Sequence, residues 1–69
     1  MLHERLKDLR TDTRYKQRDI AEALHITRQT YSHYENGTRK IPAETLIDLA
    51  DFYDITLDEL VGRTFKKEN

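Results

Sequence analysis

The stretch QRDIAEALHITRQTYSHYENG, residues 17–37, is typical of two short helices joined by a tight turn. The first helix is expected over residues 17–24, because apolar side chains recur there at the i, i+1, i+4 spacing that marks one helix face: Ile20, Ala21 and Leu24. Residues 25–26 are expected to form the turn. Two helices joined by so short a connection lie close together, so the first helix fixes the orientation of the second.

The second helix of this pair has a signal at each end. Thr27 can cap it, because its hydroxyl accepts a hydrogen bond from an unpaired backbone N–H of the first turn. The helix is expected to stop at Asn36-Gly37, since glycine readily adopts the left-handed conformation that ends helices. Tyr31 and Tyr34 lie three positions apart and are expected to face inward.

The outward face of this second helix carries hydrogen-bonding side chains and almost nothing apolar: Arg28, Gln29, Ser32 and His33. Arginine can bind both O6 and N7 of guanine in the major groove of DNA, and glutamine can bind both N6 and N7 of adenine. These four residues are therefore the candidate base-reading residues. The alternative is that they are ordinary solvated residues of an amphipathic helix.

The spacing of residues over nearly the whole chain, about 2 to 64, resembles the xenobiotic-response-element (XRE) family of helix-turn-helix regulators, which includes phage repressors and Cro proteins. The matching residues of the central pair and its exit are Gln17, Ile20-Ala21, Leu24, Ile26, Thr27-Arg28, Tyr31, Tyr34-Glu35-Asn36-Gly37 and Arg39. The match continues through Glu44-Thr45-Leu46-Ile47, Leu49-Ala50, Phe52-Tyr53, Ile55-Thr56-Leu57, Leu60 and Gly62-Arg63-Thr64. We therefore expect an all-α bundle of five short helices, lambda-repressor-like, with helices 2 and 3 as the helix-turn-helix. We expect the DNA-binding domain to comprise residues 1–64 and a short C-terminal tail to comprise residues 65–69.

The resemblance also implies further roles. In that family the glutamine that opens the second helix and the first residues of the third helix grip the DNA backbone, and the loop after the third helix contacts phosphates. The expected backbone contacts on this ground are Gln17, Thr27, Asn36, Arg39 and Lys40. Arg18 is added because it clusters with Arg14 and Lys16, which suits contacts to phosphate; the alternative is a solvated loop. Relatives also join their first and third helices by a partly buried ion pair, which implies a structural pair of Arg10 with Glu35.

Local patterns define the other helices. Leucines at 2, 6 and 9 predict an amphipathic helix from residue 2 to about 11. Lys16 is a poor cap for the helix that follows, although Asp19 favours its first turn through the helix dipole. Pro42 is expected in the first turn of a helix that runs to about Tyr53. A Thr-x-x-Glu capping box at residues 56–59 predicts a last short helix, ended by Gly62.

Composition argues against catalysis. The chain of 69 residues makes one small domain, with no cysteine for a disulfide or a thiolate nucleophile. The three histidines show no metal-ligand spacing, and the two glycines form no phosphate-binding loop. We expect no enzyme activity, no cofactor and no metal. No signal peptide or membrane-spanning run is present in the sequence, so the expected location is cytoplasmic.

Charge is distributed unevenly along the chain. Residues 1–41 carry nine Lys/Arg and six Asp/Glu, a net charge of +3, whereas residues 42–69 carry three and seven, a net charge of −4. The total of −1 argues against a nucleic-acid partner, but a basic face opposite an acidic face is compatible with one. The alternative is that the charges of the two halves intermingle in the fold.

The expected function is sequence-specific binding of double-stranded DNA by a homodimer, over a palindromic operator, as a transcriptional repressor. The expected dimer contacts are Leu57, Val61 and Phe65. One alternative is an antitoxin or another protein-interaction module on the same fold, whose main partner is a protein. Another is a fragment of a longer repressor; a free-standing regulator is favoured. A protein-docking face should carry aromatic or aliphatic anchors, and the outer face of the third helix lacks them.

Overall fold

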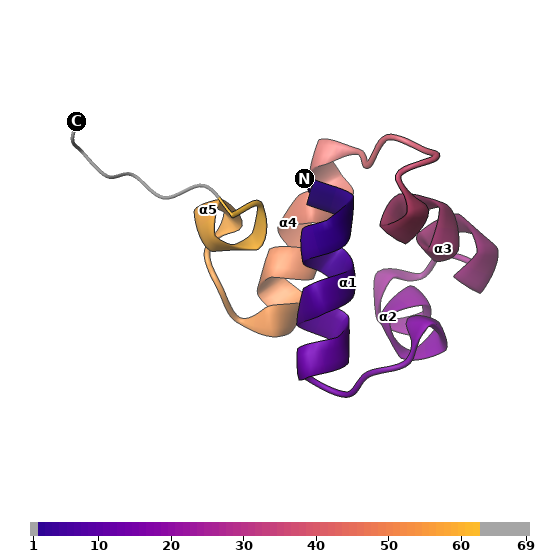
Figure 1. Cartoon of the computed structure of the whole chain (residues 1–69), viewed down its shortest axis with the longest axis horizontal. Helices are drawn as coiled ribbons and strands as arrows, with labels where there is room; N and C mark the ends of the chain where they lie inside the picture. Colours follow the sequence, from indigo (N-terminus) through magenta and orange to yellow (C-terminus); the bar gives the residue numbers. More distant parts are fainter. Residues whose placement is uncertain (1, 63–69) are drawn as a thin grey trace.

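The computed structural model describes residues 2–62, and this part of the chain folds into five α-helices with no strand (Figure 1). The helices are α1 (Leu2–Asp12), α2 (Gln17–Leu24), α3 (Arg28–Asn36), α4 (Ala43–Tyr53) and α5 (Leu57–Leu60). In Figure 1, α1 stands between the α2–α3 pair and α5, with α4 behind it. The predicted all-α, five-helix architecture is confirmed.

Each helix supplies one fully buried side chain to a single core. These five residues are Leu6, Ile20, Tyr31, Leu49 and Leu60, each with an exposed fraction of 0%. Burying a large apolar side chain contributes about 1.5–3 kcal/mol to folding. Because α3 contributes Tyr31 to this shared core, its position is fixed by the whole bundle and not only by α2.

Helix ends follow the predicted signals at three places. Thr27 Oγ1 accepts a hydrogen bond from the backbone N–H of Thr30 at 3.1 Å and so caps α3. Gly37 ends α3 in the left-handed conformation, with φ of 76°. At α5, the Thr56 hydroxyl accepts from the Glu59 N–H at 3.1 Å, and the Glu59 carboxylate accepts from the Thr56 N–H at 2.9 Å.

Two helix starts refine the sequence-based expectations. The placement of Pro42 in the first turn of α4 is wrong by one residue: the helix begins at Ala43, and Pro42 precedes it with an extended ψ of 150°. The fixed φ of proline is compatible with both positions, so its presence alone did not decide between them. At α2, the carboxylate of Asp19 accepts the backbone N–H of Lys16 at 2.9 Å, which provides a cap bond that the lysine side chain cannot.

An aromatic cluster fixes the loop between α1 and α2 against the end of α4. The ring of Tyr15 lies 5.0 Å from the ring of Phe52, and Phe52 lies 5.1 Å from Tyr53, centroid to centroid. Tyr15 keeps 40% of its surface exposed. This contact sets where the chain leaves α1 and therefore where α2 begins.

The turn between α2 and α3 holds a non-glycine residue in the left-handed region, His25 with φ of 59°. That conformation costs an L-residue about 1–2 kcal/mol, and glycine avoids the cost at the expense of greater unfolded-state entropy. We therefore expect His25→Gly to raise the free energy of unfolding by about 0.5–1 kcal/mol, measured by urea denaturation. His25→Ala keeps the backbone cost and serves as the control. An equal gain in His25→Ala would show that the imidazole, and not the backbone, is unfavourable.

Candidate nucleic-acid interface

The α3 helix has a buried inner face and an open outer face. Tyr31, Tyr34 and Glu35 keep exposed fractions of 0%, 6% and 5%. On the outer face, Arg28 and Gln29 are exposed. The other two predicted base-reading residues, Ser32 and His33, are on the same helix but only partly exposed. The structure thus gives the most freely projecting positions to the arginine and the glutamine at the start of α3.

A buried carboxylate anchors α3 to α1 and α2. Arg10 of α1 donates from Nε to Glu35 Oε2 at 2.6 Å and from Nη2 to Glu35 Oε1 at 3.2 Å. Gln17 of α2 donates from its amide to Glu35 Oε1 at 3.1 Å. The Arg10 guanidinium also donates to the carbonyl of Tyr15 at 3.0 Å. Helices α1 and α2 are therefore tied directly to one residue on the inner face of α3, and the loop at Tyr15 is tied to it through Arg10.

Electrostatics of this cluster favour an ionised carboxylate. Burial alone would raise the pKa of Glu35, but the hydrogen bond from Arg10, the nearby Tyr31 hydroxyl and the hydrogen bond from Gln17 together outweigh burial and lower that pKa below its ordinary value. Burial raises the pKa of Tyr31 well above its ordinary value, and the Glu35 carboxylate raises it further. Burial, followed by the charge of Glu35, raises the pKa of Tyr53 to about 12.

Two predicted DNA-backbone residues already use part of their hydrogen-bonding capacity inside the protein. A glutamine amide has two N–H donors, and one donor of Gln17 is directed at Glu35. The hydroxyl of Thr27 accepts the cap bond of α3 and also donates to Thr30 Oγ1 at 2.9 Å. A phosphate at these positions would therefore meet the second amide N–H of Gln17 and the backbone N–H groups of the first turn of α3.

The other predicted backbone residues lie in the open. Arg18 is exposed on α2, Asn36 is exposed at the last position of α3, and Arg39 and Lys40 are exposed in the loop that follows. This loop follows the C-terminal end of α3, whereas Arg28 opens the helix at its other end. These predicted backbone residues come from two parts of the chain, the start of α2 and the segment that leaves α3.

Thr38 is a residue of this loop that the sequence analysis did not single out. Its hydroxyl lies 2.9 Å from Nδ1 of His33 and 3.3 Å from the carbonyl of the same histidine. One ring nitrogen of His33 is thus held by the protein, and Nε2 remains as the nitrogen that can meet a base. Only the side-chain geometry reveals this bond, since nothing in the local sequence pattern requires it.

Removing the Thr38 hydroxyl tests this contact. Thr38→Val keeps the shape of the side chain, and we expect it to lower the free energy of unfolding by about 0.5–1.5 kcal/mol. Without the hydroxyl beside Nδ1, the ratio of the two neutral tautomers of the His33 ring should also change. Nitrogen-15 NMR of the imidazole measures the tautomer directly. Thr38→Ser should retain both properties, because it keeps the hydroxyl. Equal spectra for the valine and serine variants would contradict the assignment.

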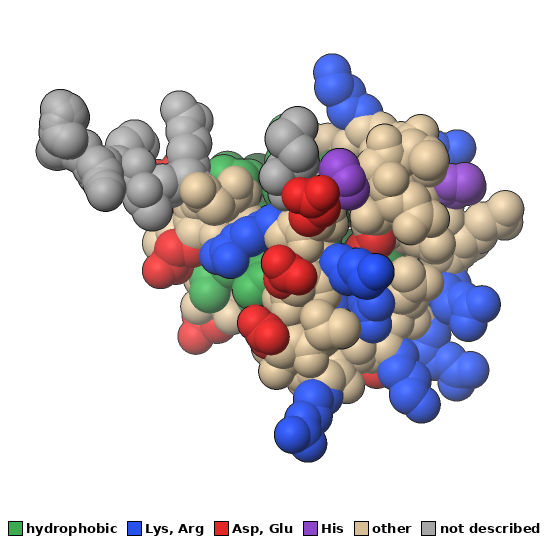
Figure 2. All heavy atoms as spheres, viewed as in Figure 1, with side chains coloured by type: hydrophobic (Ala, Val, Ile, Leu, Met, Phe, Trp, Pro, Cys, Tyr) green, Lys and Arg blue, Asp and Glu red, His purple; other side chains and the backbone are tan. Residues whose placement is uncertain are grey.

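Charge separates between the two sides of the molecule. Over residues 43–62, which make up α4 and α5, the chain has no Lys or Arg and six carboxylates: Glu44, Asp48, Asp51, Asp54, Asp58 and Glu59. In Figure 2, most of the visible Lys and Arg side chains lie on the side of α2 and α3, and most of the acidic side chains lie toward α1, α4 and α5. A polyanion would therefore be attracted to the α2–α3 side and repelled from the opposite side.

The predicted dimer residues have different surroundings. Leu57 is 43% exposed and Val61 is partly exposed, whereas Phe65 lies outside the described residues. Ile47 on α4, which was not among the predicted dimer residues, is 51% exposed. The guanidinium of Arg5 in α1 donates to the carbonyl of Glu59 at 2.7 and 3.2 Å and so holds α5 in place.

Within residues 2–62, neither a metal-binding group of side chains nor a membrane-spanning helix is found. No group of His, Cys, Asp and Glu side chains in that range could hold a metal ion. Among the helices of the same range, none combines the length and the apolar character needed to cross a membrane.

Known proteins are similar to this chain in sequence and in fold. Residues 6–60 match the family described as Helix-turn-helix. The HTH-type transcriptional regulator AnsR of Bacillus subtilis (strain 168) is 40% identical over 65 residues, 94% of this chain and 56% of that protein. The cryptic phage CTXphi transcriptional repressor RstR of Vibrio cholerae is 34% identical over 62 residues, 90% of this chain and 56% of that protein.

Structural similarity agrees with the sequence matches. The crystal structure of a transcriptional regulator from Listeria innocua is similar, with a TM-score of 0.85 and 33% identity, over 100% of this chain and 64% of that one. The chain spans 56% of the length of AnsR and of RstR, so the shared part is the helical domain described above. On the family match, the sequence identities and the fold, the chain belongs to the XRE-type helix-turn-helix family of transcriptional regulators.

Proposed function

We propose that this chain binds double-stranded DNA in a sequence-specific manner and regulates transcription. The observation that carries this proposal is the geometry of α3: its inner face is anchored by the buried Glu35 cluster, and its outer face exposes Arg28 and Gln29. A helix presented in this way fits the major groove, where these two side-chain types can distinguish guanine and adenine. Ser32 and His33 would then supply the remaining base contacts.

The DNA backbone would be held from both ends of the helix pair. Arg18 and Gln17 at the start of α2 would contact one phosphate group of a half-site, with Thr27 at the start of α3. Asn36, Arg39 and Lys40 would contact another. Such contacts fix the register of the protein on the duplex and leave sequence discrimination to α3.

Regulation is proposed to proceed through a homodimer on a palindromic operator. Leu57 of α5 is 43% exposed and Val61, which follows α5, is partly exposed. Both support a contact between two copies, and Phe65 would extend it. Two α3 helices related by a two-fold axis would read half-sites about one DNA turn apart, roughly 34–36 Å. A dimer bound across a promoter would exclude polymerase, which makes repression the proposed outcome.

The second candidate function is docking of a partner protein through α3. Hot spots of protein interfaces are rich in aromatic and arginine side chains set in apolar surroundings. The outer face of α3 offers the arginine without the apolar surroundings, because its other members are Gln29, Ser32 and His33. This composition favours DNA over protein as the ligand of that face.

Amide chemical shifts of the whole chain, followed by NMR while duplex DNA is added, test which side of the molecule binds. We expect the largest changes in residues 17–18, 27–33 and 36–40. Residues 43–62, the acidic side, should change little. Changes concentrated on α4 and α5 would contradict the proposed orientation.

Salt dependence tests the role of the loop cation Arg39. Because Arg39 is proposed to contact a phosphate and no base, Arg39→Ala should weaken binding to all sequences alike and reduce the slope of log K against log salt by about one per subunit. Lys7→Ala removes an exposed positive charge from α1 and should leave the slope unchanged. A slope that is the same in Arg39→Ala and in the unmodified protein would remove Arg39 from the interface.

A further inference from the structure

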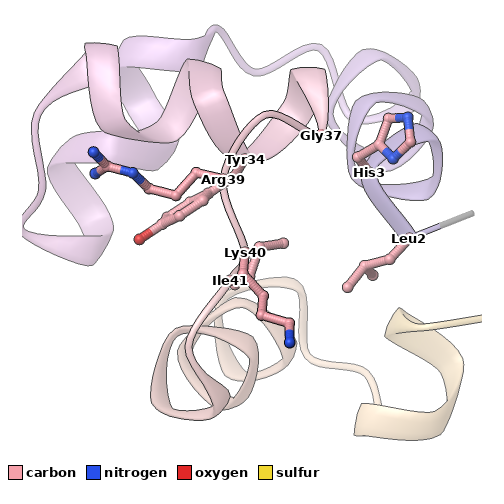
Figure 3. A pocket seen from close by; sticks show the side chains of 7 residues that line it. All are labelled: Leu2, His3, Tyr34, Gly37, Arg39, Lys40 and Ile41. Carbon is pink, nitrogen blue, oxygen red and sulfur yellow. The ribbon is translucent and has the colours of Figure 1, made fainter.

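A pocket of about 170 Å³ lies between the first turn of α1, the end of α3 and the loop that leads to α4 (Figure 3). Leu2 and His3 reach it from α1, and Tyr34 reaches it from α3. The loop contributes Lys40 and Ile41. None of these residues belongs to the base-reading face, but Lys40 is one of the proposed DNA-backbone contacts, so the pocket adjoins the proposed interface.

The lining of the pocket combines apolar and cationic groups. Leu2, Tyr34 and Ile41 provide apolar and aromatic surface, while Arg39 and Lys40 provide two positive charges. Within residues 2–62, none of the residues that line the pocket is acidic. In Figure 3, the side chain of Arg39 extends along Tyr34, whereas that of Lys40 leaves the loop in a different direction, downward in this view. This combination matches a ligand with an apolar body and one negative charge.

Size restricts the ligand further. An apolar cavity of about 150 Å³ in another protein holds one benzene molecule. The pocket described here is of similar volume, about 170 Å³, and opens to solvent beside charged residues. A single aromatic ring would therefore fill the apolar part, and a carboxylate on that ring would reach the open, cationic edge.

The geometry of the loop next to the pocket is set by close packing. Gly37 has φ of 76°, and a Cβ atom placed there would lie 2.9 Å from Nδ1 of His3. The first turn of α1 thus packs directly against the backbone at the end of α3. The loop that carries Arg39 and Lys40 begins at this contact between His3 and Gly37. The same contact therefore positions both the pocket wall and the loop.

We propose that this pocket binds a small aromatic monocarboxylate, with the ring against Leu2, Tyr34 and Ile41 and the carboxylate beside Lys40. Bound there, the ligand neutralises a loop cation that the proposed function assigns to the DNA backbone, and it lowers DNA affinity. The pocket is then an effector site. Ligand binding itself is independent of the proposed function, and only its effect on DNA rests on it.

Benzoate is the probe for the first test, an NMR titration of the unmodified chain. Benzoate should shift the amides of residues 2–3, 37 and 40–41. Benzyl alcohol lacks the charge, and inorganic phosphate lacks the ring. Each should bind with an affinity at least about tenfold lower than that of benzoate, because each loses one of the two interactions. Phosphate binding equal to that of benzoate, or shifts located elsewhere, would overturn the proposal.

Variants add a second test. Leu2→Trp places a larger side chain in the pocket and should weaken benzoate binding by about tenfold or more, while Ile47→Trp, at an exposed position of α4, should not. Lys40→Gln should also weaken benzoate binding, and Lys40→Arg should restore it. Unchanged benzoate affinity in both Leu2→Trp and Lys40→Gln would overturn the site.

DNA binding in the presence of benzoate separates the two parts of the proposal. Benzoate should lower the affinity of the unmodified chain for its DNA site and should have no effect on the Leu2→Trp variant. Benzoate that binds in the pocket without changing DNA affinity would overturn the effector role. Failure to bind any DNA, with the pocket shifts intact, would refute the proposed function and leave the ligand site standing.

Discussion

Arg10→Met is expected to lower the free energy of unfolding by about 3–5 kcal/mol at neutral pH, because it leaves the Glu35 carboxylate buried without its cation. The Glu35 side chain is only 2% exposed, so water cannot replace the lost bonds. Stability in small domains amounts to about 0.05–0.15 kcal/mol per residue, so a loss of this size is large for a chain of 69 residues. Urea denaturation followed by circular dichroism measures it.

Removing the other partner of the ion pair should lower the free energy of unfolding by less. Glu35→Gln leaves Arg10 without its partner, but the Arg10 side chain is 15% exposed and keeps its bond to the Tyr15 carbonyl. We expect a loss of about 1–3 kcal/mol. Arg18→Met, which removes an exposed arginine of α2, is the matched control and should change stability by less than about 0.5 kcal/mol. Equal losses in Arg10→Met and Arg18→Met would contradict the role of the pair.

The pH dependence of this pair has a sign that can be tested. In the unmodified protein the pKa of Glu35 is lowered from its ordinary value of 4.5, so its stabilising contribution is present above pH 4.5 and is lost as the pH falls through the lower folded-state pKa. In Arg10→Met, burial dominates and raises that pKa. Stability of the variant should then be lost as the pH rises through the raised pKa, and the gap to the unmodified protein should be smaller at pH 4 than at pH 7.

Arg28→Ala is expected to cost about 1–3 kcal/mol of DNA-binding free energy per half-site and to relax the base preference at one position of each half-site. The exposed guanidinium at the start of α3 is the group with the geometry to bind a guanine by two hydrogen bonds. Gln29→Ala should have a similar effect at a neighbouring position. A phosphate-contacting residue, by contrast, would lower affinity for every sequence alike.

Competition titrations with operator variants measure this discrimination. Lys7→Ala is the matched control, because it removes the same charge from an exposed position on α1. It should leave base preference unchanged at every position. If Arg28→Ala kept full discrimination between operator variants, the assignment of the reading face would be wrong.

Local signals predicted much of the fold. The Thr27 cap, the Gly37 exit and the Thr56–Glu59 capping box each act within four residues, so their sequence pattern carries the whole interaction. The start of α4 was placed one residue early, because proline fits both positions near a helix start.

Contacts between distant segments were less predictable. The bond from Gln17 to Glu35 spans 18 residues, and the clamp of Arg5 on the Glu59 carbonyl spans 54. No periodicity encodes such pairs, because they depend on how helices pack. The same reason applies to the partial burial of Ser32 and His33, which helical spacing alone placed on an open face.

Selection of bound duplexes from a random DNA library at near-physiological salt tests directly whether this chain reads DNA sequence through α3. The proposed function predicts enrichment of one two-fold-symmetric site with half-sites about one turn apart, roughly 34–36 Å. Loss of that enrichment in Arg28→Ala would link it to α3. Weak, salt-sensitive binding without any enriched sequence would contradict specific readout and would favour a protein partner for this chain.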